Sequence, residues 1–173
     1  MKTEEKKYTM TDDTIVFCGI KLSRIKALRD FGNVKANELG GYISCEKNLS
    51  HYGTCWVSDD ALVCGDALVM GDARVCGSAR VGDSAIVCGD AIVSDRAKVG
   101  DFALVRARAH VSGEARVSDH AHVCGDAIVS DHAQVCDYAI VRDWAIVRDF
   151  ALVCDDAHVC GSARVGDSEI VKD

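Results

Sequence analysis

The stretch ARVCGSARVGDSAIVCGD, residues 73–90, decides the fold, because it is three copies of one six-residue pattern. In each copy valine comes two positions after alanine, and glycine or aspartate comes two positions after valine. Twenty valines keep this register without a slip from Val57 to Val171. Alanine keeps it from Ala61 to Ala163, and Glu169 takes the last alanine position. A fixed internal period of this kind predicts a repeat architecture.

The pattern predicts a short strand followed by a corner. Alanine and valine are two residues apart, so in an extended strand both point to the same side, and the residues next to valine point outward. Glycine tolerates a positive φ, and aspartate bonds its own backbone in bends. Three such flat sides close a coil of eighteen residues, in which valine stacks on valine and each strand pairs with the coils above and below it.

This pattern resembles the hexapeptide-repeat proteins of the bacterial transferase superfamily. The resemblance implies an all-β fold, a left-handed parallel β-helix forming a triangular solenoid. Left-handed coils are an exception to the usual right-handed crossover. We expect the solenoid to occupy residues 43–173, preceded by a small N-terminal β cap in residues 1–42.

The segment before the repeat indicates how the solenoid is capped. Residues 1–13 are polar, and we expect the start of this segment to be frayed. Residues 14–17 and 20–28 predict a β-hairpin around Cys18 and Gly19, with a short helix as the alternative for the second half. Residues 41–43 fit the alanine-to-valine pattern of a first coil side, and two extra residues near residues 51–54 predict a bulge.

The cap also carries a second, narrower resemblance. It is similar to the N-terminal part of the YdcK-like hexapeptide-repeat proteins of bacteria and phages. The residues that carry the similarity are Ser23–Phe31, Leu39–Ile43, Glu46–Ser50 and Trp56–Val57.

Composition narrows the class of partner. The net charge of −7 argues against general affinity for nucleic acid or for anionic membranes. No apolar run approaches eighteen residues, and the first residues contain no apolar core of a secretory signal. We therefore expect a cytoplasmic protein, in which ten cysteines remain reduced.

The outward residues that lie eighteen positions apart in the sequence fall one above another in the stack. They form three rows, one on each side of the prism. The third row is the most apolar, and a contiguous apolar patch on a flat face is typical of an interaction surface. We predict that this row forms a homo-oligomer interface, as a trimer or a dimer. Its members are Leu68, Ile86, Leu104, His122, Ile140 and His158.

The second row is basic in its middle, where Arg80, Lys98 and Arg116 follow one another coil by coil. Stacked like charges repel, so an anion that bridges them is favoured. We therefore take these three residues as candidate ligand-binding residues for a phosphate-bearing ligand such as coenzyme A. The alternative is a solvated face relieved by the corner aspartates.

Seven cysteines follow repeat valines. Cys136 and Cys154 are predicted to be neighbours in the stack, near enough to pair on oxidation. The spacing of the cysteines does not match the CxxC…CxxC pattern of common zinc sites, so the sequence predicts no metal site.

Histidines suggest a different function. In the superfamily that the repeat resembles, a histidine acts as general base while acyl-CoA lies between subunits. This resemblance implies an acyl-CoA-dependent acetyltransferase as the alternative function, with acetyl-CoA as cofactor and with His122 or His158 as the base. The repeat contains no inserted loop, however, and flat sides form no pocket. We predict a non-enzymatic scaffold that has no catalytic residue and no cofactor.

Four aromatic residues are predicted at corners, where they are candidates for a ridge that binds a protein partner. They are Phe102, Tyr138, Trp144 and Phe150.

Overall fold

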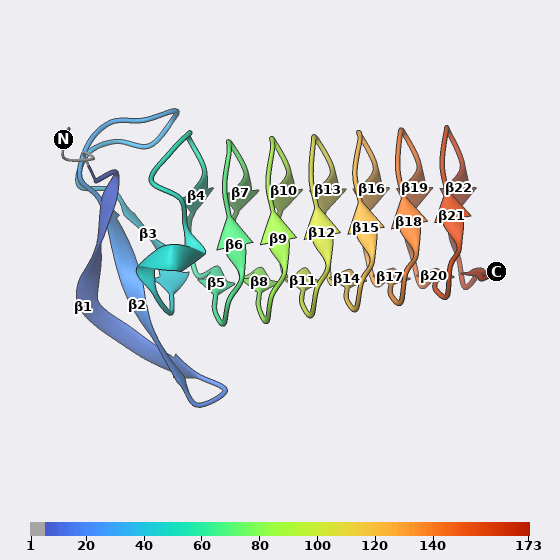
Figure 1. Cartoon of the computed structure of the whole chain (residues 1–173), viewed down its shortest axis with the longest axis horizontal. Coiled ribbons are helices and arrows are strands. Elements are labelled where there is room, and N and C mark those ends of the chain that lie inside the picture. Colours follow the sequence, from blue (N-terminus) through green and yellow to red (C-terminus); the bar gives the residue numbers. More distant parts are fainter. Residues whose placement is uncertain (1–5) are drawn as a thin grey trace.

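The computed structural model describes residues 6–173 and is an all-β solenoid of stacked parallel coils (Figure 1). Each side of a coil contributes a strand of two residues, formed by an outward residue and the repeat valine. The strands pair in register with those one coil before and one coil after, as Lys98 does with Arg80 and Arg116. The predicted three-sided parallel β-helix is therefore confirmed.

The first side is a seven-stranded parallel sheet. Its strands are β4 (Trp56–Val57), β7 (Arg74–Val75), β10 (Ile92–Val93), β13 (His110–Val111), β16 (Ile128–Val129), β19 (Ile146–Val147) and β22 (Arg164–Val165).

The second side continues the sheet of the cap, which makes it ten-stranded. Its solenoid strands are β5 (Leu62–Val63), β8 (Arg80–Val81), β11 (Lys98–Val99), β14 (Arg116–Val117), β17 (Gln134–Val135), β20 (Leu152–Val153) and β23 (Ile170–Val171).

The third side is a six-stranded parallel sheet. Its strands are β6 (Leu68–Val69), β9 (Ile86–Val87), β12 (Leu104–Val105), β15 (His122–Val123), β18 (Ile140–Val141) and β21 (His158–Val159).

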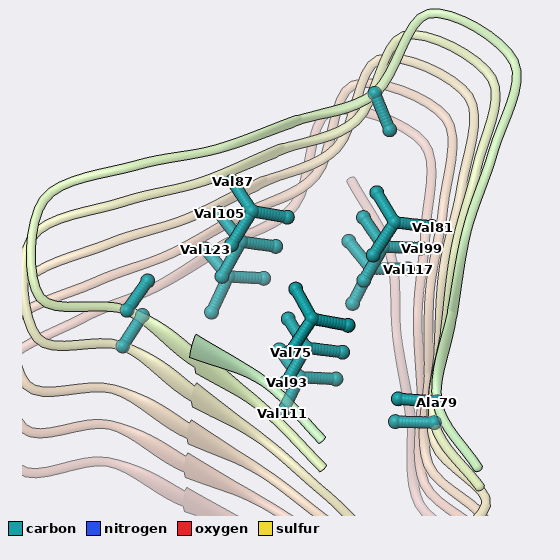
Figure 2. Close-up of a cluster of buried hydrophobic side chains, with 14 of the residues drawn as sticks. Val75, Ala79, Val81, Val87, Val93, Val99, Val105, Val111, Val117 and Val123 are labelled. Atoms are coloured by element: carbon teal, nitrogen blue, oxygen red, sulfur yellow. The ribbon is translucent and has the colours of Figure 1, made fainter. Parts of the chain in front are cut away.

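The core is narrow and uniform. Figure 2 shows the valines of the three sides as three columns that meet at the axis, with alanines near the corners. Nearly all of these valines and alanines are fully buried. Burying a valine contributes about 1.5–3 kcal/mol, which must offset an ordering cost of about 1–2 kcal/mol per residue. The stability of the solenoid therefore depends on many coils stacking together.

The corners explain why glycine and aspartate alternate in the sequence. The first corner residue has a positive φ throughout the repeat, whether it is a glycine such as Gly89 (φ 70°) or an aspartate such as Asp119 (φ 56°). Aspartate adds a bond between coils: Asp101 Oδ2 accepts the backbone N–H of Asp119 at 3.2 Å, and Asp119 Oδ2 accepts that of Asp137 at 3.4 Å. Many corner carboxylates therefore join one coil to the next.

The cap is a hairpin of β1 (Tyr8–Phe17) and β2 (Ile20–Ala27). Strand β2 pairs antiparallel with β3 (Leu39–Ile43), and β3 pairs parallel with β5. A 3₁₀ turn, Glu46–Asn48, leads into the first coil. The predicted hairpin is confirmed, and its second half is a strand rather than the alternative helix. The predicted boundary between residues 42 and 43 falls inside β3, which pairs with β2 of the cap on one edge and with β5 of the solenoid on the other.

The expected fraying at the start of residues 1–13 concerns residues 1–5, which lie outside the described part, and the rest of this polar segment is anchored to the solenoid. Lys7 and Tyr8 are fully buried. The Lys7 ammonium donates to the carbonyl of Cys55 at 2.8 Å, and the Tyr8 hydroxyl lies 2.8 Å from the carbonyl oxygen of Leu49. These long side chains bury their apolar parts against the first coil, where its carbonyl groups satisfy their polar ends.

Candidate functional site

The end of the hairpin lies against the second side of the solenoid. Phe17 ends β1, and the Arg80 guanidinium lies over its ring, 4.7 Å from the centroid. Phe17 and Ile15 also pack against a buried cluster of Leu22, Tyr42 and Leu62. In Figure 1 the hairpin leaves the end of the stack and its tip reaches the level of β5 and β8. The hairpin therefore covers part of the second side, which is otherwise flat.

A groove of about 540 Å³ lies between the hairpin tip and the second side. One end of it is apolar and is formed by Phe17, Ile20 and Leu62. The groove then runs along the coils past the three basic residues. Its further lining residues are Cys18, Cys64, Arg80, Val81, Gly82, Asp83, Lys98, Val99, Gly100, Asp101, Arg116, Val117, Ser118, Gln134 and Cys136.

The three cations of the groove form a ladder. Arg80, Lys98 and Arg116 are in-register neighbours, so their backbones are about 4.8 Å apart. Within residues 6–173, none of the three forms an ion pair with a carboxylate. Asp83 and Asp101 line the same groove, but their carboxylates accept backbone N–H groups one coil further on. The structure thus brings the predicted ligand-binding residues together without a counter-charge in contact with them.

A second, polar hollow of about 220 Å³ adjoins the same ladder. Arg80, Lys98 and Arg116 line it together with Arg96 and Glu114, and the last two form an ion pair with each other. The ladder is therefore bordered by two depressions. Three cationic side chains can donate hydrogen bonds to an anionic ligand there. One of them is Arg116, whose planar guanidinium can donate two parallel hydrogen bonds.

The predicted interface residues form one continuous row on the third side. Leu68, Ile86, Leu104, His122 and Ile140 are half-buried, and His158 is exposed. Their register pairing follows the predicted order without a break. Figure 1 shows the strands of this side with no other segment crossing in front of them.

The two candidate catalytic histidines do not meet. His122 pairs with Ile140, and Ile140 pairs with His158, so one coil separates the two imidazoles. Two other histidines lie in ring stacks at corners: His120 lies between Phe102 and Tyr138 at centroid distances of 5.0 and 4.9 Å. His132 stacks on Phe150 at 4.8 Å.

The four corner aromatics do not form one ridge, which corrects that part of the sequence analysis. Phe102 and Tyr138 share the corner between the second and third sides, with His120 between them. Phe150 lies at the corner between the first and second sides, and Trp144 at the remaining corner. All four are more than 60% exposed. A period of eighteen places residues on one corner only if their numbers differ by a multiple of eighteen.

No helix in the described part of the chain is long and apolar enough to span a membrane. In comparisons with known proteins, no protein-family model matches the chain, and no curated protein matches it significantly.

Proposed function

We propose that this protein is a non-enzymatic scaffold, a rigid prism that associates with further copies of itself through its third side. The observation that carries the proposal is the continuous row of that side, from Leu68 to Ile140, which is aliphatic except for His122 and lies on a flat sheet. A regular face of this kind presents matching apolar surface to a second copy, and burying it removes that surface from water.

The position of the cap supports the choice of side. The hairpin contacts the second side through Phe17 and Arg80. The segment around Gly32 and Val34 borders a hollow on the first side, beside Trp56. The described part of the cap leaves the outward row of the third side open along the stack (Figure 1). A second copy can therefore approach this side along its length.

The experiment is size-exclusion chromatography with light scattering. We expect a mass that is a multiple of 18.5 kDa for the unaltered chain. Leu104→Glu, in the centre of the row, should shift the protein to the monomer mass. Ile128→Glu makes the same kind of change on the first side and should leave the oligomer intact. A monomeric unaltered chain at high concentration contradicts the proposal.

The groove favours a second candidate, an acyl-CoA-dependent acetyltransferase whose site is completed between subunits. The specific observation is the ladder of Arg80, Lys98 and Arg116 with no carboxylate in contact, beside an apolar pocket end. Phosphate groups and a neighbouring apolar moiety match that combination. In this candidate His122 or His158 acts as general base from the third side, which requires a second copy to bring it to the substrate.

Calorimetry with coenzyme A separates the two candidates. If the protein is the acetyltransferase, coenzyme A should bind saturably, and Arg116→Gln should weaken that binding strongly. The protein should also turn over acetyl-CoA, and His122→Gln or His158→Gln should abolish the turnover. Arg164→Gln, on the first side, is the matched control for the loss of an outward arginine. The scaffold proposal expects no turnover in any of these proteins.

A further inference from the structure

Two identical tripeptides, Val135–Asp137 and Val153–Asp155, lie directly on each other in the stack. Strands β17 and β20 pair in register, so Cys136 and Cys154 are neighbours that both point outward just before a corner. No other two cysteines that follow repeat valines occupy neighbouring coils on one side. These two alone are followed by aspartate; glycine follows the other five, which are Cys64, Cys76, Cys88, Cys124 and Cys160.

The side chains of the two tripeptides converge. Asp137, Cys154 and Asp155 each bring one ligand atom to within 4.8 Å of the others. Cys136 Sγ lies 3.5 Å from Asp137 Oδ2, which joins the fourth side chain to the group. The backbone N–H of Asp155 donates to Asp137 Oδ2 at 3.2 Å and holds that carboxylate in place. The ligand atoms of Asp137, Cys154 and Asp155 therefore lie close together at the corner between the second and third sides, and the Cys136 thiol lies beside them through its contact with Asp137.

The spacing of the two strands suits a metal ion that bridges the two sulfur atoms. Side chains in register on parallel strands stand side by side, about 4.8 Å apart. A tetrahedral metal with metal–sulfur bonds of about 2.3 Å holds two sulfur ligands about 3.8 Å apart. The same strand spacing lies within the range of about 4.4–6.8 Å between the Cα atoms of a disulfide, so the form that binds the metal is the reduced one, in which both cysteines are free thiols.

The electrostatics of the cluster also suit a cation. Burial, together with the neighbouring Asp137 carboxylate, raises the pKa of the Cys136 thiol to about 12. Burial and the carboxylates of Asp155 and Asp137 raise the pKa of the Cys154 thiol, which Lys172 lowers. Within the described residues, neither carboxylate has an ion-pair partner. A divalent cation would compensate this accumulated negative charge and allow both thiols to ionise.

We propose that Cys136, Asp137, Cys154 and Asp155 form a binding site for a thiophilic divalent cation, Zn²⁺ by preference. Both thiols lose their protons to solvent when two metal–sulfur bonds form, and the carboxylates supply two oxygen ligands. Two sulfur and two oxygen ligands in tetrahedral geometry fit Zn²⁺, which has no geometric preference of its own. The bound ion would join two neighbouring coils near the C-terminal end of the stack.

The test is a titration of the reduced, chelator-treated full chain with Co²⁺, a spectroscopic substitute for Zn²⁺. We expect one equivalent to give sulfur-to-metal charge-transfer bands and the intense visible bands of a tetrahedral ion, both abolished by Zn²⁺. Cys136→Ser and Cys154→Ser should each lower the intensity of the charge-transfer bands, because each removes one of the two sulfur ligands. The double variant Asp137→Asn with Asp155→Asn should weaken binding by at least about tenfold, the effect of losing even an outer partner of a metal ligand.

The matched control is Cys64→Ser, which replaces a cysteine at the same position of the repeat on the same side. It should leave the Co²⁺ spectrum unchanged. A second measurement uses only the unaltered chain: Zn²⁺ should protect Cys136 and Cys154 from alkylation, mapped by peptide mass spectrometry, and leave Cys18 reactive. The proposal is overturned by an octahedral Co²⁺ spectrum, by equal protection of all cysteines, or by full affinity in the aspartate double variant.

Discussion

Arg80 and Phe17 connect the cap to the solenoid face, because the guanidinium lies over the aromatic ring at 4.7 Å. The contact places the hairpin tip beside the basic ladder and gives the groove its apolar end. Without it the second side would be a flat sheet. The groove thus depends on contacts between the hairpin and repeat residues, of which Phe17 with Arg80 is one and the packing of Phe17 and Ile15 on the cluster that contains Leu62 is another.

The first prediction concerns this contact. Phe17→Ala should lower the free energy of unfolding by about 1–2 kcal/mol, because it removes a cation–π contact and the packing of the ring. It should also increase amide hydrogen exchange at the hairpin tip, while exchange in β14 and beyond stays unchanged. Val16→Ala is the control, since Val16 is 74% exposed. An unchanged exchange rate at the tip would show that the hairpin is held by other contacts.

The second prediction concerns Ala107, which is the one alanine at a left-handed corner of the described repeat, with φ 60°. Its Cβ is strained there, and it offers no oxygen to the next coil. Ala107→Asn should raise the free energy of unfolding by about 0.5–1 kcal/mol, because asparagine tolerates this conformation and its side-chain oxygen can accept an N–H group. Urea denaturation measures the change.

A substitution at a neighbouring corner, Gly89→Ala, tests the same reasoning in the opposite direction. At Gly89 an added Cβ would lie 2.9 Å from the backbone nitrogen of Ala107. Gly89→Ala should therefore destabilise the protein by more than about 1 kcal/mol. If both variants shift the urea midpoint in the same direction, conformational strain at the corners is not the cause.

The third prediction concerns Tyr8 and pH. Burial raises the pKa of the Tyr8 hydroxyl, and the Glu46 carboxylate adds to this. In the unfolded chain the phenol ionises near pH 10, whereas in the folded protein it keeps its proton. Above pH 10 the folded state therefore binds more protons than the unfolded state, and the Tyr8 contribution to stability falls as pH rises.

Tyr8→Phe should lower stability at neutral pH by about 1–3 kcal/mol, because the carbonyls of Glu46 and Leu49 lose the hydroxyl. It should also flatten the decline above pH 10. Denaturant titrations of both proteins from pH 7 to pH 11 measure the difference. Parallel curves across that range would mean that Tyr8 ionises equally in both states.

Much of the solenoid was predictable because each repeat unit meets only its neighbours. The period of valine and alanine determines which residues face inward, and the register of eighteen predicts the single row of Arg80, Lys98 and Arg116 that the strand pairing shows. The same register separates Phe150 and Trp144 from the corner of Phe102. The four aromatics therefore cannot share one ridge, because Trp144 and Phe150 do not differ from Phe102 by a multiple of eighteen.

The groove and the burial of Lys7 were not predictable from the repeat. Both depend on how a non-repeating hairpin twists and leans, which is set by contacts distant in sequence, such as Phe17 with Arg80 and Lys7 with Cys55. The proposed metal site was missed for a different reason. Its thiols are eighteen residues apart along the chain, so a search for CxxC spacing does not find ligands that a stack brings together.

The last prediction tests the core. Ala127 is fully buried, and the backbone bonds between coils place Ala109 and Ala145 directly on either side of it. Ala127→Phe would force a large ring into a column of methyl groups and should cost at least about 1–3 kcal/mol, with loss of cooperative unfolding if the stack divides. The control is Ile128→Phe at the next position, whose side chain points outward and which should change stability by less than about 0.5 kcal/mol. Calorimetry of both variants decides the matter: equal melting temperatures would mean that the interior has room for the ring, and that close stacking of alanine and valine is not what holds the coils together.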